Sequence, residues 1–258
     1  TSRLLNVPHF IKPEDADFMV ETRVKVVQPQ QELCIAGLIN FGVRSSKGDF
    51  VFLLDDSTSE IKHRVYGRDG NWLGQMLAYA GDQKIGAVGG LIVDRERSVV
   101  ISAGRAVSGD GTVADLHQGE RIESAGYFAR LLGSSNCTAL RLGSLVTKRT
   151  VFDEVGGLDE KIPDDLVDLD YGLRLRANGY RSVVLSQYHF SQNELSISEK
   201  LGSANSRSSR SERQRFFQKW GSQIPAQDPF YSPNLRFVGN CARYQLDVEL
   251  PEESLASS

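Results

Sequence analysis

Residues 50–54 (FVFLL) form the least ambiguous segment of the chain, because every position is apolar and the run stops abruptly at Asp55 and Asp56. A strand that is apolar on both faces is typical of a parallel strand covered by helices on either side. Ligands bind beyond the carboxyl ends of the strands in such sheets. The two acids are therefore the first candidates for a functional site.

Segments with strand and helix patterns alternate along the rest of the chain. The predicted strands are 24–27, 50–54, 85–93 and 183–185, and the predicted helices are 32–44, 71–80 and 163–178. Asn71 is the expected N-cap of the second helix, and Gly179 is expected to end the third. This alternation indicates an open α/β sheet with helices on both faces.

The remaining segments carry weaker patterns. Residues 94–135 are rich in glycine, serine and charge, with only weak strand signals at 99–101, so we expect irregular excursions over the sheet there. Residues 196–213 lack apolar periodicity and predict a mobile loop. We therefore expect one domain over 1–197, with 198–258 forming a flexible loop and a C-terminal extension that packs on it.

Composition excludes several classes of protein. The chain has 30 Lys+Arg against 33 Asp+Glu, so no general positive field would attract nucleic acid or an anionic membrane. Its apolar stretches are far shorter than the ~20 residues of a membrane-spanning helix, and its start does not resemble a signal peptide. Three widely spaced cysteines (Cys34, Cys137 and Cys241) suit neither a disulfide framework nor a zinc site. We expect a cytoplasmic protein.

The acids at the tip of the 50–54 strand need a partner. Asp55 and Asp56 repel each other unless a positive or hydrogen-bonding group lies beside them. A hard divalent cation such as Mg2+ or Mn2+ would bind their oxygens and keep a phosphate as a further ligand. The alternative is that the pair begins a solvated turn.

A second group of acids lies on the predicted 163–178 helix. Asp170 falls within its apolar stripe, and we expect an ion pair with Arg174, four residues later. Asp168 falls on a different face, where it is free to line a cleft. A carboxylate near a helix N-terminus is favoured in its ionised form, as a general base requires. The alternative is that Asp168 merely complements the helix dipole. The apolar stripe consists of Leu166, Leu169, Leu173 and Ala177.

The glycines and histidines give weaker indications of a functional site. The glycines of 86–90 (GAVGG) lie inside an apolar strand, so close packing explains them better than a dinucleotide site, and a nucleotide-dependent oxidoreductase has no other support. His189 follows the predicted 183–185 strand and is the histidine nearest the ligand edge. An ordinary loop histidine is its alternative interpretation.

Taken in order, these segments resemble the family 2 glycosyltransferases of the GT-A fold, most closely the rhamnosyltransferase-like and O-antigen-type members. The matching segments are Asn40-Phe41-Gly42, 48–56 (GDFVFLLDD), Trp72-Leu73 with Met76-Leu77, 86–90 (GAVGG), 148–160 (KRTVFDEVGGLDE), 168–180 (DLDYGLRLRANGY) and, in the tail, Phe217, Trp220 and 228–234 (DPFYSPN).

The resemblance implies a mostly parallel, open mixed sheet and a sugar transfer. The donor would be a nucleotide-diphosphate sugar and the acceptor a hydroxyl of a cell-surface glycan precursor, free or lipid-linked, with inversion at the transferred carbon. Asp168 matches the family's proposed base. The implied nucleotide-sugar contacts are Asp55, Asp56, Asn40, Gly156 and Gly157, and the implied ligands of Mn2+ or Mg2+ are Asp56, Asp55 and His189. Location would be cytoplasmic, with the inner face of the membrane as one option.

The sequence departs from the family pattern at four places. Ser57 replaces an acid, Val167 replaces the glutamate beside Asp168, and the first βαβ unit is missing before Thr1. The family's late histidine aligns near Gln192 or Asn193, whereas His189 lies about three positions earlier. We therefore expect a GT-A domain truncated at its N-terminus, completed by a missing segment or a partner chain. The alternative function is a non-catalytic, degenerate GT-A module that binds sugar or a partner protein.

Overall fold

A computed structural model describes most of the chain. The described residues are 2–3, 25–54, 57–63, 71–94, 96, 98–108, 112–192, 210–221, 223–224, 228–231, 235–238 and 241–246. The helices are α2 (Ile35–Ser45), α3 (Trp72–Gly81), α4 (Arg149–Glu154), α5 (Val167–Ala177) and α7 (Arg210–Trp220), with a 3-10 turn η1 (Tyr127–Ala129). The strands are β1 (Ser2–Arg3), β2 (Lys25–Val26), β3 (Phe50–Leu54), β4 (Thr58–His63), β5 (Ile85–Asp94), β6 (Val99–Ser102), β7 (Arg105–Val107), β8 (Val113–Leu116), β9 (Ser134–Cys137), β10 (Ser144–Lys148), β11 (Arg181–Gln192), β12 (Leu235–Val238) and β13 (Cys241–Leu246).

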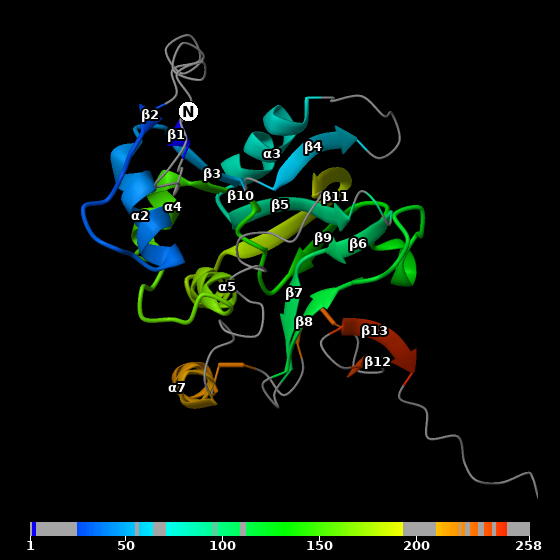
Figure 1. Cartoon of the computed structure of the whole chain (residues 1–258). Helices are drawn as coiled ribbons and strands as arrows, with labels where there is room; N and C mark the ends of the chain where they lie inside the picture. Colours follow the sequence, from blue (N-terminus) through cyan, green and yellow to red (C-terminus); the bar gives the residue numbers. More distant parts are fainter. Residues whose placement is uncertain are drawn as a thin grey trace, which may run out of the picture.

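A mixed sheet forms the centre of the molecule (Figure 1). Its strand order is β3-β10-β5-β11-β4, with β6 added to β5 and β9 to β11. β5 and β11 are parallel, whereas β10 is antiparallel to both β3 and β5, so that β3 and β5 run the same way. The expected open mixed sheet is confirmed, although antiparallel neighbours outnumber parallel ones among the described strands of this sheet.

The two faces of the sheet carry separate hydrophobic cores. Leu145 belongs to the core under α2, α4 and α5, whereas the next residue, Val146, belongs to the core under α3. Val184 and Leu185 divide in the same way, because successive side chains of a strand point to opposite faces. The expected helices on both faces are therefore confirmed (Figure 1).

Local signals account for several of these elements. The Asn71 side chain accepts a hydrogen bond from Gly74 N at 3.1 Å, which confirms the expected N-cap of α3. A Cβ atom added to Gly90 would collide with Phe190 Cε2 and lie 2.9 Å from Tyr188 O. The glycines of β5 are thus explained by close packing, as expected.

The expectation of irregular structure over 94–135 is wrong. This segment contains β6, β7 and β8, and β7 and β8 join β12 and β13 in a second sheet of order β12-β13-β8-β7. These strands are three or four residues long and bury polar side chains such as Ser102 and Asp115. Such short strands with polar interiors carry no clear apolar alternation.

Two element boundaries also differ from expectation. α5 begins at Val167 instead of 163, because Leu166 N bonds Pro163 O at 2.8 Å in a turn before the helix. β11 runs over 12 residues, far beyond the predicted 183–185. Its register against β5 shifts between Leu185 and His189, which interrupts the apolar pattern and places His189 within the strand rather than after it.

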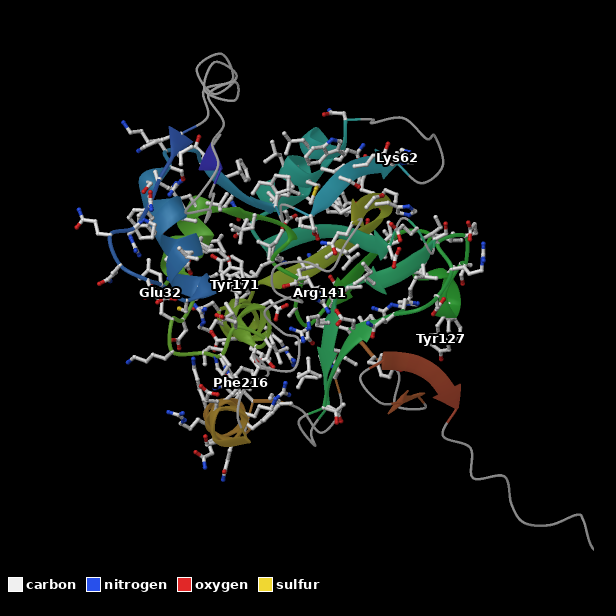
Figure 2. All side chains as sticks on the ribbon, in the orientation of Figure 1. Glu32, Lys62, Tyr127, Arg141, Tyr171 and Phe216 are labelled. Carbon is white, nitrogen blue, oxygen red and sulfur yellow. The ribbon has the colours of Figure 1, made fainter. Side chains whose placement is uncertain are left out.

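α7 packs against α5 (Figures 1 and 2). Phe216, which Figure 2 labels, and Trp220 are both buried in the same core as Leu169 of α5. The expected domain boundary at 197/198 lies outside the described residues, so the two-part division stays a prediction. Among the described helices, none is long and apolar enough to span a bilayer.

Candidate functional site

α5 approaches its neighbours closely along most of its length. Its residues from Val167 to Leu173 are all buried. A Cβ atom added to Gly172 would collide with Thr138 O and lie 2.7 Å from Ala139 Cβ. Ala139 in turn exchanges backbone hydrogen bonds with Arg105 at the start of β7, at 2.8 and 3.2 Å. The missing side chain at Gly172 therefore lets the first turn of α5 reach β7.

Asp168, in that first turn, is 9% exposed. Its Oδ1 atom accepts hydrogen bonds from Arg105 Nη1 and from Leu169 N, the latter at 2.7 Å. The helical pattern placed Asp168 on a face free to line a cleft; in the structure Arg105 of β7 contacts its carboxylate on that face, and a cleft beside it stays a prediction. No hydrogen bond from another described residue reaches Oδ2, which is not among the fully buried unpartnered oxygens.

Arg105 belongs to a chain of four alternating charges. Its Nη1 also donates to Asp165 O at 3.1 Å, and its Nε lies 4.0 Å from Asp115 Oδ1. Asp115 on β8 forms an ion pair with Arg141, whose Nε and Nη2 donate hydrogen bonds to the two carboxylate oxygens at 2.8 and 2.6 Å. A bidentate pair of this kind fixes orientation as well as charge. We call Asp168, Arg105, Asp115 and Arg141 the charge cluster.

The pKa values of the two carboxylates of the charge cluster are shifted in opposite directions. Burial raises the pKa of Asp168, and the nearby guanidinium groups of Arg105 and Arg141 offset this only in part. Burial acts on Asp115 in the same sense, but Arg141 and Arg105 outweigh it, so that the pKa of Asp115 is lowered. A carboxyl group with a raised pKa is better matched to accepting a proton near neutral pH.

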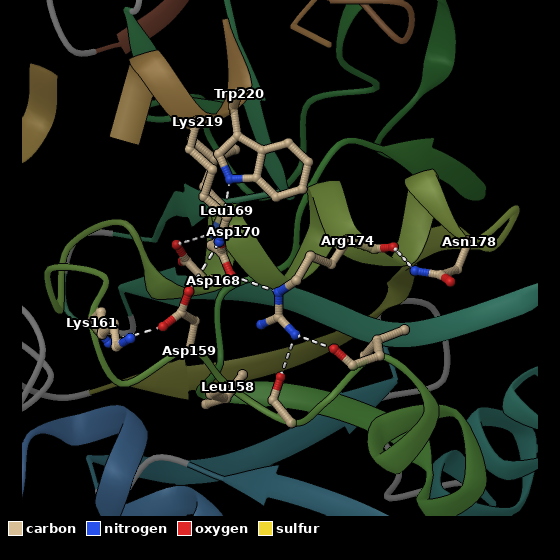
Figure 3. Close-up of polar contacts among 12 residues, drawn as sticks. Leu158, Asp159, Lys161, Asp168, Leu169, Asp170, Arg174, Asn178, Lys219 and Trp220 are labelled. Carbon is tan, nitrogen blue, oxygen red and sulfur yellow. Dashed lines mark hydrogen bonds and ion pairs between the residues drawn. The ribbon is translucent and has the colours of Figure 1, made fainter. Parts of the chain in front are cut away.

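Asp170 has the structural role predicted for it. Its carboxylate, fully buried, accepts from Arg174 Nε at 2.7 Å, as the i,i+4 spacing indicated. Two residues of α7 bond the other oxygen, Lys219 Nζ at 2.8 Å and Trp220 Nε1 at 2.9 Å (Figure 3). The Asp170 network therefore joins α7 to α5.

Asn40 and the Gly156-Gly157 turn lie together. Asn40 Nδ2 donates to Leu158 O at 2.8 Å, and Leu158 N donates to Asn40 Oδ1 at 2.9 Å. Both glycines have positive φ, and a Cβ atom on Gly157 would lie 2.9 Å from Asn40 Oδ1. Asn40 thus ties α2 to the turn that precedes α5. A contact of these three residues with a nucleotide sugar stays a prediction.

The carboxyl end of β3 lies near the charge cluster. Leu54, the last residue of β3, pairs with Ser144 of β10. Arg141 precedes Ser144 by three residues, which even a fully extended chain spans in about 11 Å. Asp55 and Asp56 lie outside the described residues, so their own place in the site stays a prediction.

His189 is buried and pairs in register with Leu91 of β5. Its strand neighbour Phe190 belongs to the core under α3, so His189 faces the other side, where α5 lies. Within the described ranges, no group of three or more histidine, cysteine or acidic residues could hold a metal ion. A site for Mn2+ or Mg2+ that includes Asp55, Asp56 and His189 stays a prediction.

Sequence patterns gave no indication of Arg105, Asp115 or Arg141. Arg105 contacts Asp168 across 63 residues of sequence, and its strand falls in the segment expected to be irregular. One signal was available: Gly172 interrupts a helix four residues after Asp168, where a close approach of another chain segment is the usual explanation.

Comparison with known proteins gives two relatives in sequence, and no protein-family model matches the chain. The chain is 32% identical over 228 residues to the uncharacterized protein y4gI of Sinorhizobium fredii (strain NBRC 101917 / NGR234), covering 85% of this chain and 23% of that protein. It is 24% identical over 203 residues to the O-antigen biosynthesis protein RfbC of Myxococcus xanthus, covering 76% of this chain and 14% of that protein. The chain thus spans less than a quarter of the length of either relative.

Among solved structures, the fold resembles that of GalNAc-T7, crystallised with UDP, GalNAc and Mn2+. The TM-score is 0.52 at 13% identity, over 74% of this chain and 37% of that chain. This likeness confirms the expected GT-A-like fold. At such low identity it establishes the fold alone.

Proposed function

We propose that the chain transfers a sugar from a nucleotide-diphosphate donor to an acceptor hydroxyl, with Asp168 as the general base. The observation that carries this proposal is the geometry of Asp168: a buried carboxylate with one oxygen fixed and the other without a hydrogen bond from the described residues. Burial raises the pKa of this carboxyl group, which suits the same role. A GT-A-like fold, shared with a protein crystallised with UDP and GalNAc, supports the same conclusion.

The proposed step inverts the transferred carbon. Asp168 Oδ2 takes the proton of the acceptor hydroxyl as the hydroxyl oxygen attacks the anomeric carbon of the donor. The bond between that carbon and the phosphate oxygen breaks, and its electron pair leaves with the nucleoside diphosphate. A raised pKa favours uptake of the proton, whereas Arg105 keeps enough of the carboxyl group ionised to act as a base.

The donor side of the proposal rests on Asp55, Asp56, Asn40 and the Gly156-Gly157 turn. The end of β3 lies near Arg141, and the turn is tied to α5 through Arg174, whose Nη1 bonds Gly157 O at 2.6 Å. Donor and acceptor groups would then meet on the α5 side of the sheet. A divalent cation, Mn2+ or Mg2+, would offset the charge of the diphosphate, with Asp56, Asp55 and His189 as its proposed ligands.

The acceptor is proposed to be a cell-surface glycan precursor, free or lipid-linked. The name of the RfbC relative supports this class of acceptor, as does the resemblance to O-antigen-type members of family 2. The same resemblance favours a cytoplasmic protein that works at the inner face of the membrane.

Donor titration tests the function. The chain is titrated with UDP-, GDP- and dTDP-sugars, with and without Mn2+, and product formation is followed with glycan acceptors. We expect one nucleotide class to bind and to support transfer. Donor binding without transfer to any acceptor would favour the non-catalytic GT-A module, and the absence of all donor binding would exclude the transferase.

An Asp168→Asn variant tests the base. Transfer should fall by about 10²-fold or more while the dissociation constant of the donor stays within about twofold, because a general base acts in the transition state. Asp153→Asn is the matched control, since Asp153 is exposed on α4. Equal transfer by Asp168→Asn and the control would exclude Asp168 as the base.

A further inference from the structure

Both hydrogen bonds from described residues to the Asp168 side chain end on the same oxygen. Arg105 Nη1 and Leu169 N both donate to Oδ1. The backbone donor belongs to α5 itself. Arg105 is the donor that comes from another element, and it determines how the carboxyl plane is turned relative to β7.

We propose that Arg105 is a positioning residue for Asp168: it fixes Oδ1 and thereby leaves Oδ2 as the atom that accepts the proton of the acceptor hydroxyl. This inference rests on the proposed function. In this proposal Arg105 contacts neither the donor nor the acceptor.

The backbone of Arg105 is held firmly enough for this role. Its N and O atoms both bond Ala139, and the absence of a side chain at Gly172 lets α5 approach Ala139. The separation between the backbones of Arg105 and Asp168 is therefore set by backbone contacts.

The guanidinium group is held by the remaining members of the charge cluster. Nη1 bonds Asp165 O, and Nε faces Asp115 Oδ1 at 4.0 Å without a hydrogen-bond acceptor among the described residues. Arg141 uses two donors to fix Asp115. Because Arg141 neutralises much of the Asp115 charge, Arg105 remains available to Asp168.

Loss of Arg105 should therefore have two separable effects. The carboxyl group of Asp168 would lose its orientation, which lowers the rate of the chemical step. It would also lose its nearest positive charge, so that it takes up protons at higher pH. The charged groups around Asp168 are Arg105 on β7, Arg141 before β10 and Asp115 on β8.

Kinetics of Arg105→Ala and Arg105→Lys test this role. We expect Arg105→Ala to lower kcat by about 10- to 100-fold, with donor affinity within about twofold, and to move the acidic limb of the kcat/KM profile to higher pH. Arg105→Lys keeps the charge and should restore the acidic limb while kcat recovers only in part. Arg121→Ala is the control, because Arg121 pairs with Glu123 on the exposed surface. An Arg105→Ala enzyme with unchanged kcat and pH profile, measured where Asp168→Asn is inactive, would overturn the inference.

A second measurement needs no activity. The unfolding midpoints of Arg105→Ala, Asp168→Asn and the double variant are compared in denaturant. Direct contact predicts that the two single effects do not add, and strict additivity would overturn the inference even in an active enzyme. The two single effects could also be non-additive in a chain whose wild type transfers no sugar. That result would overturn the proposed function but would support the contact by which Arg105 orients Asp168.

Discussion

The indole Nε1–H of Trp220 donates a hydrogen bond to the buried carboxylate of Asp170 at 2.9 Å, joining residues 50 positions apart. The same oxygen accepts from Lys219, and the other is bonded by Arg174. The acid two residues away, Asp168, has no such set of donors. Of the two aspartates in this helical turn, Asp170 thus has a structural role, and Asp168 has the proposed catalytic role.

Removing the indole donor should weaken the docking of α7. Trp220→Phe keeps most of the apolar ring but loses a hydrogen bond to a charged group, so we expect a loss of about 2 kcal/mol in the free energy of unfolding. Asp170→Asn should be worse, about 3 to 5 kcal/mol, because Arg174 would lose its buried partner. Denaturant unfolding measures both.

Lys219→Ala is the control for this network. Its side chain is 40% exposed, and solvent screening limits an exposed charge to about 1 kcal/mol or less. A Lys219→Ala variant less stable than Asp170→Asn would contradict the assignment of Asp170 as the centre of the network.

Gly172→Ala should destabilise the chain although alanine is the better helix former. The added methyl group would collide with Thr138 O, and we expect a loss of about 2 to 3 kcal/mol in the free energy of unfolding. Gly81→Ala is a matched control at the end of α3, where a Cβ atom meets nothing within 4 Å, and it should gain up to about 1 kcal/mol. Equal stabilisation by both changes would show that α5 does not pack closely on Thr138.

The sequence predicts structure that depends on neighbouring residues better than structure that depends on contacts between distant segments. The 50–54 strand and the Asn71 cap depend on neighbouring residues, so local patterns were sufficient. The charge cluster depends on contacts between distant segments. A helical wheel assumes that one side of a helix faces solvent, whereas α5 has the sheet on one side and β7 or α7 on others. The burial of Asp168 therefore could not be predicted from its helix alone.

Asp228 should be necessary for docking of the segment after α7. Its buried carboxylate accepts from Val107 N at 3.0 Å, Thr138 Oγ1 at 2.6 Å and Phe230 N at 2.9 Å. Asp228→Ala would leave buried donors unpaired, so we expect a loss of about 2 to 5 kcal/mol in the free energy of unfolding. Asp228→Asn retains one acceptor oxygen and should lose less. If both variants unfold like the wild type, the carboxylate does not hold this segment.

The lowered pKa of Asp115 predicts one form of pH dependence. An acid whose pKa is depressed by folding contributes stability that is present above its unfolded value, near 3.8, and lost as the pH falls through its folded value. The stability difference between wild type and Asp115→Asn should therefore shrink in acid. Urea unfolding between about pH 2 and 7 measures it, and a difference that grows in acid would contradict the ion pair with Arg141.

The raised pKa of Asp168 predicts the opposite sign. Its contribution is present below the unfolded value, near 3.8, and is lost as the pH rises through its raised folded value. The stability of the wild type relative to Asp168→Asn should therefore fall on going from pH 4 to neutral pH, in the range where Asp115→Asn shows a constant difference. The same urea series measures both variants. If the stability difference from wild type changed with pH in the same way for both variants, Asp168 would be as well stabilised in its ionised form as Asp115. The physical basis for its role as a base would then be lost. Opposite slopes would show that folding holds Asp168 in a less stable ionised state, which is the condition that makes uptake of a proton favourable.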